Sequence, residues 1–160
     1  MRSSDEPNAA ALRREAESAT AASWLKAHLD RIGEGDYFAV LAYIAMNKAH
    51  ESRLHNIRTR VRDRRGIATC LGFGPRFLHS TGQAYKGGPN TGVFLQITSD
   101  DAADLPVPGA RYTFGIVKTA QARGDFQVLL ERGRRALHVH LGADVEAGLA
   151  RLEQIVNEVV

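Results

Sequence analysis

Strand-length apolar runs alternate along this chain with stretches that have helical spacing. The clearest run spans residues 36–45, where aliphatic and aromatic residues follow one another almost without interruption. Such a run is typical of a strand that helices cover on both faces, as in a parallel sheet. Strands that alternate with helices indicate βαβ units. We therefore expect an α/β three-layer fold, with a mostly parallel sheet of about four or five strands flanked by helices.

The other elements follow from the same two patterns. Helical spacing predicts helices over residues 9–32, 47–65, 113–132 and 144–159. Short apolar segments predict strands over residues 67–73, 91–98 and 136–141, and an Asp- and Pro-containing surface loop over 99–110. Residues 1–8 are polar, so we expect a disordered lead-in to a helix capped by Asn8. Residues 9–160 are long enough for a single domain with one core.

The net charge and the cysteine content limit which kinds of partner and which compartment we expect. Twenty-one Lys and Arg oppose eighteen Asp and Glu, a net charge of +3 that favours an anionic metabolite and not a nucleic acid. Six arginines between residues 53 and 65 have no interleaved aromatics, so we interpret them as a solvated helix face. Cys70 is the single cysteine, and no apolar run has the length of a membrane span or signal peptide. We expect a cytoplasmic protein with no membrane partner.

A glycine-dense segment, residues 71–98, is the most informative stretch for function. Its sequence is LGFGPRFLHSTGQAYKGGPNTGVFLQIT, and glycines let backbone N–H groups approach a ligand closely. A helix that begins near His79 would direct its positive end at an anion, and Arg76 would complete the anion pocket, unless it is a plain surface arginine. Phe77 occupies the place of the third glycine in a dinucleotide motif, so a nucleotide cofactor is disfavoured. A small phosphorylated molecule is the expected ligand.

Three motifs in and after this segment carry a family resemblance. They are LHSTGQ followed by KGG at residues 78–88, TGVFLQIT at 91–98 and YTFG at 112–115. Their order and spacing resemble the phosphoglucose isomerase family, in particular its C-terminal sugar-isomerase (SIS) domain in bacterial transaldolase/glucose-6-phosphate isomerase fusions. The resemblance implies an SIS-like domain that takes part in interconverting glucose 6-phosphate and fructose 6-phosphate, in glycolysis and gluconeogenesis, with no cofactor and no metal.

His79 is the expected catalytic residue. An imidazole that titrates near neutrality can give a proton to a sugar ring oxygen, and the matching histidine of the family is assigned that ring-opening role. The alternative is a histidine at a helix start that only bonds a backbone carbonyl. Without the resemblance, the residue alone favours that alternative.

Five further residues complete the expected substrate site. Lys86 is expected to reach a phosphate or an enediolate oxygen, or else to be solvated. Ser80, Thr81 and Gln83 offer donors for sugar hydroxyls, although Ser and Thr at a helix start also serve as caps; Arg76 is the fifth. His138 and His140 share one face of a strand as a potential metal pair, but with no third ligand we interpret them as ordinary strand residues and expect no metal site.

The chain also departs from the family in three places. Isomerisation needs a carboxylate base, and neither Glu34 nor Glu51 has a suitable context. Leu149 stands where related isomerases carry a ring-opening lysine, for which Lys86 is a hypothetical substitute, and the first SIS domain is absent. We expect a domain that is incomplete alone, with a homodimer or a separate N-terminal isomerase half as partner. The alternatives are a non-catalytic sugar-phosphate-binding module and a structural remnant that dimerises through its last helix.

Overall fold

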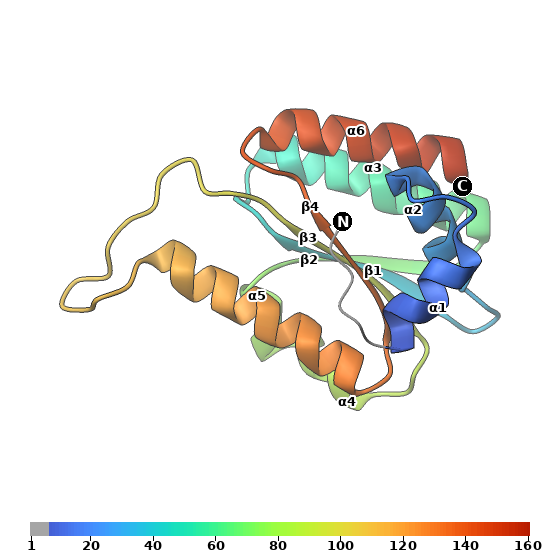
Figure 1. The fold of residues 1–160 in the computed structure, drawn as a ribbon, viewed down its shortest axis with the longest axis horizontal. Helices are drawn as coiled ribbons and strands as arrows, with labels where there is room; N and C mark the ends of the chain where they lie inside the picture. Colours follow the sequence, from blue (N-terminus) through green and yellow to red (C-terminus); the bar gives the residue numbers. More distant parts are fainter. Residues whose placement is uncertain (1–6) are drawn as a thin grey trace.

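A four-stranded parallel sheet forms the centre of the molecule in the computed structural model, which describes residues 7–160 (Figure 1). Its strand order is β2-β1-β3-β4, and every neighbouring pair is parallel. The elements are α1 (Pro7–Glu15), α2 (Ala21–Leu29), β1 (Tyr37–Tyr43), α3 (Lys48–Arg65), β2 (Ala68–Phe73), the 3-10 turn η1 (Arg76–His79), α4 (Thr81–Gly87), β3 (Gly92–Thr98), α5 (Phe114–Glu131), β4 (Arg135–His140) and α6 (Val145–Val159). The α/β prediction is confirmed.

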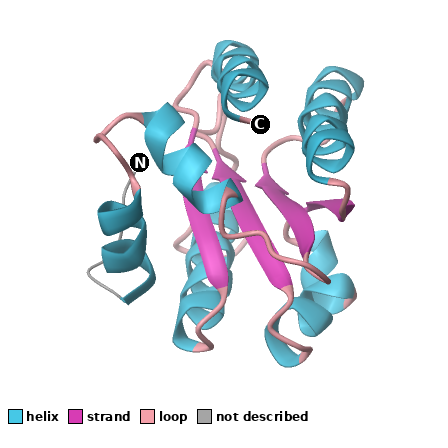
Figure 2. Cartoon of the chain, turned by 90° about the vertical axis from the view of Figure 1, so that its right-hand side faces the viewer, coloured by secondary structure: helices cyan, strands magenta, loops and turns pink. Residues whose placement is uncertain are grey.

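Side chains alternate between two hydrophobic cores, one on each face of the sheet. Phe38, Val40 and Ala42 of β1 point into the larger core, which α1, α2, α3 and α6 cover. Ala39 and the other odd-numbered residues of β1 point into a smaller core under η1, α4 and α5. Figure 2 shows the sheet between these two helical layers. Burial on both faces explains why the strands read as continuous apolar runs.

The single helix expected over residues 9–32 is wrong, since α1 ends at Glu15 and α2 begins at Ala21. Between them the Thr20 hydroxyl caps α2 by accepting a hydrogen bond from the amide of Ser23, and the Ser18 amide donates to the Ser23 hydroxyl at 3.0 Å. Hydroxyl side chains that bond nearby backbone groups compete with helix formation, so the polar segment breaks the helix despite its spacing.

The expected boundary at the N-terminal end also differs from the structure. Helix α1 begins at Pro7, which suits the first helical position, whereas Asn8 was expected to cap the helix from outside. The expected lead-in over residues 1–8 otherwise falls on residues 1–6, which lie outside the described residues. No helix in residues 7–160 combines the length and apolar character of a membrane span.

The strand order places a topological switch point between β1 and β3. The chain leaves β1 for β2 on one side of the sheet and leaves β3 for β4 on the other. Ligands of open parallel sheets bind outside the carboxyl ends of the strands near such a point. Residues 44–47, the turn after β2 and the loop over residues 99–113 all begin at this edge, and the loop projects away from the sheet together with the start of α5 (Figure 1).

Candidate functional site

The glycine-dense segment begins at the carboxyl end of β2, beside β1. The Gly74 amide donates a 2.9 Å hydrogen bond to the carbonyl oxygen of Ala42 and so extends the pairing of β2 with β1. A Cβ atom at Gly74 would lie 2.5 Å from the ring of Tyr43, which is fully buried. Glycine is needed here because the backbone passes directly against an aromatic ring.

Five of the six residues predicted from the sequence to form the site are exposed and lie in η1, in α4 or between them. We call the exposed side of this segment the η1–α4 patch; it consists of Arg76, His79, Ser80, Thr81 and Gln83. All five are exposed because η1 and α4 turn their buried residues, Phe77 and Tyr85, towards the sheet. The patch is therefore a surface that a ligand or a partner can reach.

Local contacts hold the patch in shape. The Gln83 side-chain amide donates to the carbonyl oxygen of Leu78 at 2.8 Å, and Arg76 Nη1 lies 3.4 Å from the sulfur of Met46. Ser80 occupies the N-cap position of α4 but makes no capping hydrogen bond with its side chain. A capping role for Ser80 therefore does not account for its presence. Since α4 has seven residues, its dipole is a minor source of attraction for an anion, and the side chains must supply the binding groups.

Lys86, the sixth predicted residue, points away from the patch. Its Nζ lies 2.7 Å from Oδ1 of Asp125 on α5, and Asp125 is 4% exposed. The lysine is thus the counter-ion of a buried carboxylate. Its predicted contact with a substrate would require the side chain to leave Asp125.

Asp125 and Tyr43 form a buried polar pair, and Lys86 joins it from the side of α4. Oδ2 of Asp125 and the Tyr43 hydroxyl are both buried, and neither has a partner at normal hydrogen-bond geometry. Burial raises the pKa of Tyr43, and the neighbouring Asp125 carboxylate raises it further. Asp125 and Tyr43 were not predicted as site residues. The signal in the sequence is that Asp125 shares a helical stripe with Ala122 and Leu129, both buried.

The two histidines of β4 share a face, as the strand period predicts. Nε2 of His138 and Nδ1 of His140 lie 2.8 and 2.9 Å from the same hydroxyl, that of Thr98 on β3. Nε2 of His140 also lies 3.3 Å from a carboxylate oxygen of Asp100. Within residues 7–160, no group of three His, Cys, Asp or Glu side chains is placed to hold a metal ion.

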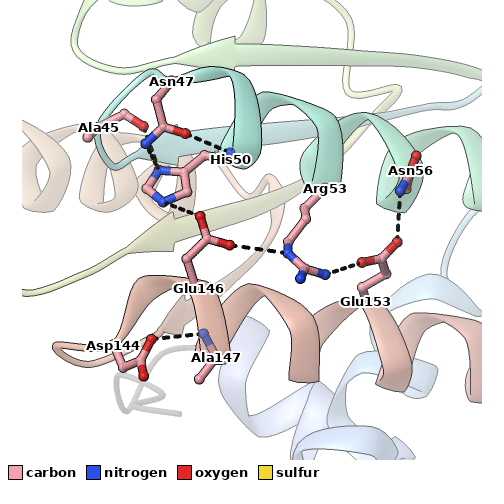
Figure 3. Close-up of polar contacts among 9 residues, drawn as sticks. All are labelled: Ala45, Asn47, His50, Arg53, Asn56, Asp144, Glu146, Ala147 and Glu153. Carbon is pink, nitrogen blue, oxygen red and sulfur yellow. Dashed lines mark hydrogen bonds and ion pairs between the residues drawn. The ribbon is translucent and has the colours of Figure 1, made fainter.

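A third polar group joins the start of α3 to α6 (Figure 3). His50 Nδ1 lies 2.8 Å from the carbonyl oxygen of Ala45, just after β1, and its Nε2 lies 3.3 Å from Glu146. Arg53 contacts Glu146 at 3.3 Å and Glu153 at 2.9 Å. The six arginines between residues 53 and 65 were interpreted as a solvated helix face. This interpretation is wrong for Arg53, whose ion pairs link α3 to α6. This group therefore has a structural role, since it links α3 to α6.

Comparison with known proteins supports the fold alone. No family model and no curated protein matches the chain. Among solved structures, a hypothetical protein, TT0462, from Thermus thermophilus has a similar fold, with a TM-score of 0.72 and 14% sequence identity. The similarity covers 93% of this chain and 42% of that one, so the chain spans less than half the length of this structural relative.

Proposed function

We propose that this chain is the C-terminal SIS domain of a glucose-6-phosphate isomerase, which binds a sugar phosphate at the η1–α4 patch and does not turn it over alone. The observation that carries the proposal is the exposure of Arg76, His79 and Gln83 in the segment that follows the carboxyl end of β2 in a parallel sheet. That edge is where open α/β sheets bind their ligands. The sequence motifs supply the substrate class.

The side chains of the patch suit a phosphorylated sugar. Arg76 presents a guanidinium whose planar donors match a phosphate, and His79 presents an imidazole that can exchange a proton with a ring oxygen. Ser80, Thr81 and Gln83 add hydroxyl and amide groups for sugar hydroxyls. The proposed division of roles is therefore phosphate binding by Arg76, ring opening by His79 and hydroxyl recognition by the other three.

Three features of the structure favour an incomplete site. Asp125 contacts one predicted residue, Lys86. It is buried and ion-paired, which makes it a poor proton acceptor for a sugar carbon. Leu149, at the position of the lysine in related isomerases, is fully buried in the larger core. The patch is also exposed, so a bound ligand would be left largely in contact with solvent. A second domain or subunit would have to supply the base and close the site.

Calorimetric titration with fructose 6-phosphate tests the proposal. We expect heat of binding to the wild-type chain, weaker binding of inorganic phosphate, and at least a tenfold loss of fructose 6-phosphate affinity in His79→Ala. His55→Ala is the matched control, because His55 is another exposed histidine, on α3, and this variant should bind as the wild type does. Absence of sugar-phosphate binding, or equal losses in both variants, would contradict the proposed site.

The second candidate is a non-catalytic sugar-phosphate-binding module, which the engagement of Asp125 by Lys86 favours. The two candidates differ in what an N-terminal SIS domain adds. The isomerase proposal expects glucose 6-phosphate formation from fructose 6-phosphate when such a domain is mixed with this chain, and loss of that activity with His79→Ala. Binding with no activity in the mixture would support the binding module.

A further inference from the structure

A pocket opens between α2, β4 and α6, and we call it the α2–α6 pocket. Its volume is about 180 Å³. Helices α2 and α6 lie on the same side of the sheet and cover the larger core (Figure 1). The η1–α4 patch lies on the other side, over the smaller core. A ligand in this pocket would therefore occupy a site separate from the patch.

The walls of the pocket are mainly apolar. They include the side chains of Ala21, Leu25, Val139, Leu141, Leu152 and Ile155. Leu25 and Leu152 are at most 5% exposed, so they lie at the inner end, and the other four are partly open to solvent. An apolar cavity of about 150 Å³ is large enough to bind benzene. The pocket therefore has room for one ring or a short branched chain.

Backbone contacts hold the wall around Leu141 in place. The Leu141 amide donates to the carbonyl oxygen of Thr98 at 2.9 Å, and the Asp100 amide donates to the carbonyl oxygen of Gly142 at 3.1 Å. On α6, a Cβ atom at Gly148 would lie 2.8 Å from Cβ of Leu141, so helix and loop are already in close contact. The pocket is thus formed before any ligand binds, as most small-molecule sites are.

One cation borders these apolar walls. Arg151, on α6, is exposed, and its side chain has no hydrogen-bond or ion-pair partner among residues 7–160. The positions one turn away on α6, where a counter-ion would lie, carry no acidic side chain; they are Ala147, Gly148, Gln154 and Ile155. Arg53 of the neighbouring α3, by contrast, pairs with two glutamates. The Arg151 guanidinium is free to bind an anion.

The remaining polar lining residue is His140, and both of its ring nitrogens are engaged. Nδ1 lies 2.9 Å from the Thr98 hydroxyl, and Nε2 lies 3.3 Å from a carboxylate oxygen of Asp100. Asp100 is therefore an acidic group close to the pocket, and it would repel a second negative charge on a ligand. This arrangement favours an anion with a single charge over a phosphate dianion.

We propose that the α2–α6 pocket binds a small monocarboxylate whose apolar part is one ring or a short branched chain. The apolar part would lie against Leu25, Leu152 and Ile155, and the carboxylate would pair with Arg151. A guanidinium can hold a carboxylate through two parallel hydrogen bonds, which matches one arginine to one carboxylate. The site does not depend on whether the η1–α4 patch binds a sugar phosphate.

A chemical-shift titration of the ¹⁵N-labelled full chain with benzoate tests the site. We expect shifts in residues 21–25, 139–141 and 148–155, with no concentration of shifts in residues 76–83. Benzyl alcohol has the ring without the charge, and acetate has the charge without the ring. Each should bind at least about tenfold more weakly than benzoate, because each lacks one of the two contacts.

Variants separate the charge from the apolar walls. Arg151→Gln should weaken benzoate binding about tenfold and leave the affinity for benzyl alcohol unchanged. Arg64→Gln is the matched control, because Arg64 is an exposed arginine on α3, and it should bind both ligands as the wild type does. Ala21→Trp places a large side chain at the exposed wall and should abolish binding of both. Circular dichroism would verify that each variant is folded.

Three results would each overturn the proposal. They are the absence of benzoate-induced shifts at the pocket, equal affinities for benzoate and benzyl alcohol, and equal losses of benzoate affinity in the two arginine variants.

Discussion

Nζ of Lys86, on α4, lies 2.7 Å from Oδ1 of Asp125, on α5. This ion pair joins the short helix of the η1–α4 patch to the long helix that covers the same face of the sheet. The lysine side chain keeps partial contact with solvent, whereas the carboxylate has almost none. The pair therefore helps to hold α4 against α5. Since α4 carries part of the η1–α4 patch, the position of the patch depends on Asp125 keeping Lys86 as its counter-ion.

Removing the two charges should have unequal effects. Lys86→Met leaves the buried Asp125 carboxylate without a counter-ion and should lower the free energy of unfolding by about 3–5 kcal/mol. Asp125→Asn leaves a lysine that can still reach water, and the expected loss is about 1–3 kcal/mol. Urea unfolding at pH 7 would measure both. Equal losses, or a larger loss for Asp125→Asn, would show that the carboxylate is not buried as described.

Two glycines of α4 offer a matched pair of substitutions. A Cβ atom at Gly82 would lie 2.8 Å from the carbonyl oxygen of Phe77, whereas a Cβ at Gly87 meets nothing within 4 Å. Gly82→Ala should therefore destabilise the protein by about 1–3 kcal/mol through overpacking. Gly87→Ala should be neutral or slightly stabilising, because alanine lowers the entropy of the unfolded chain. Thermal unfolding would separate them, and a stabilising Gly82→Ala would contradict the tight contact.

His28 should make stability depend on pH. It is fully buried, and its Nε2–H donates to the carbonyl oxygen of Phe94 at 3.0 Å. Burial, together with a smaller effect of the nearby charge of Arg31, lowers the pKa of His28 from 6.5 to about 3. The unfolded chain takes up this proton near pH 6.5 and the folded chain does not, so the stabilisation is complete above pH 6.5 and is lost as the pH falls towards 3.

The expected loss is about 1.4 kcal/mol for each pH unit below about 6.5. Free energies of unfolding between about pH 7.5 and 5, a range in which few carboxyl groups titrate, would measure it. The slope should be steeper for the wild type than for His28→Gln, which has no titrating ring. Parallel curves for the two proteins would mean that His28 takes up its proton in the folded state as readily as in the unfolded chain.

The link between α3 and α6 should contribute modestly. Glu153→Gln removes the 2.9 Å ion pair with Arg53, and both side chains are partly exposed. We expect a loss of up to about 1 kcal/mol at low salt that shrinks as salt is added. Asp63→Asn, which removes the exposed pair with Arg62, is the control and should cause no measurable change. A similar loss in the two variants would argue against a role for the α3–α6 contact.

The sheet could be predicted from the sequence because each strand is a short apolar run that can be recognised from its own residues. The break between α1 and α2 could not, because helical spacing continues through Ser18 and Thr20 and the local hydrogen bonds of their side chains decide the conformation. The exposed placement of His79 follows from its position at the end of η1. The inward direction of Lys86 depends on Asp125, a residue distant in sequence, and no local pattern reports that pairing.

The most direct test of the account is a chemical-shift titration of the ¹⁵N-labelled chain with fructose 6-phosphate. Shifts should concentrate in residues 76–83 and in the His79 ring, and inorganic phosphate should perturb Arg76 more than Gln83. The account predicts little change at His138 and His140, which lie on β4. Shifts centred on those histidines, or on no continuous surface, would contradict a sugar-phosphate site at the η1–α4 patch.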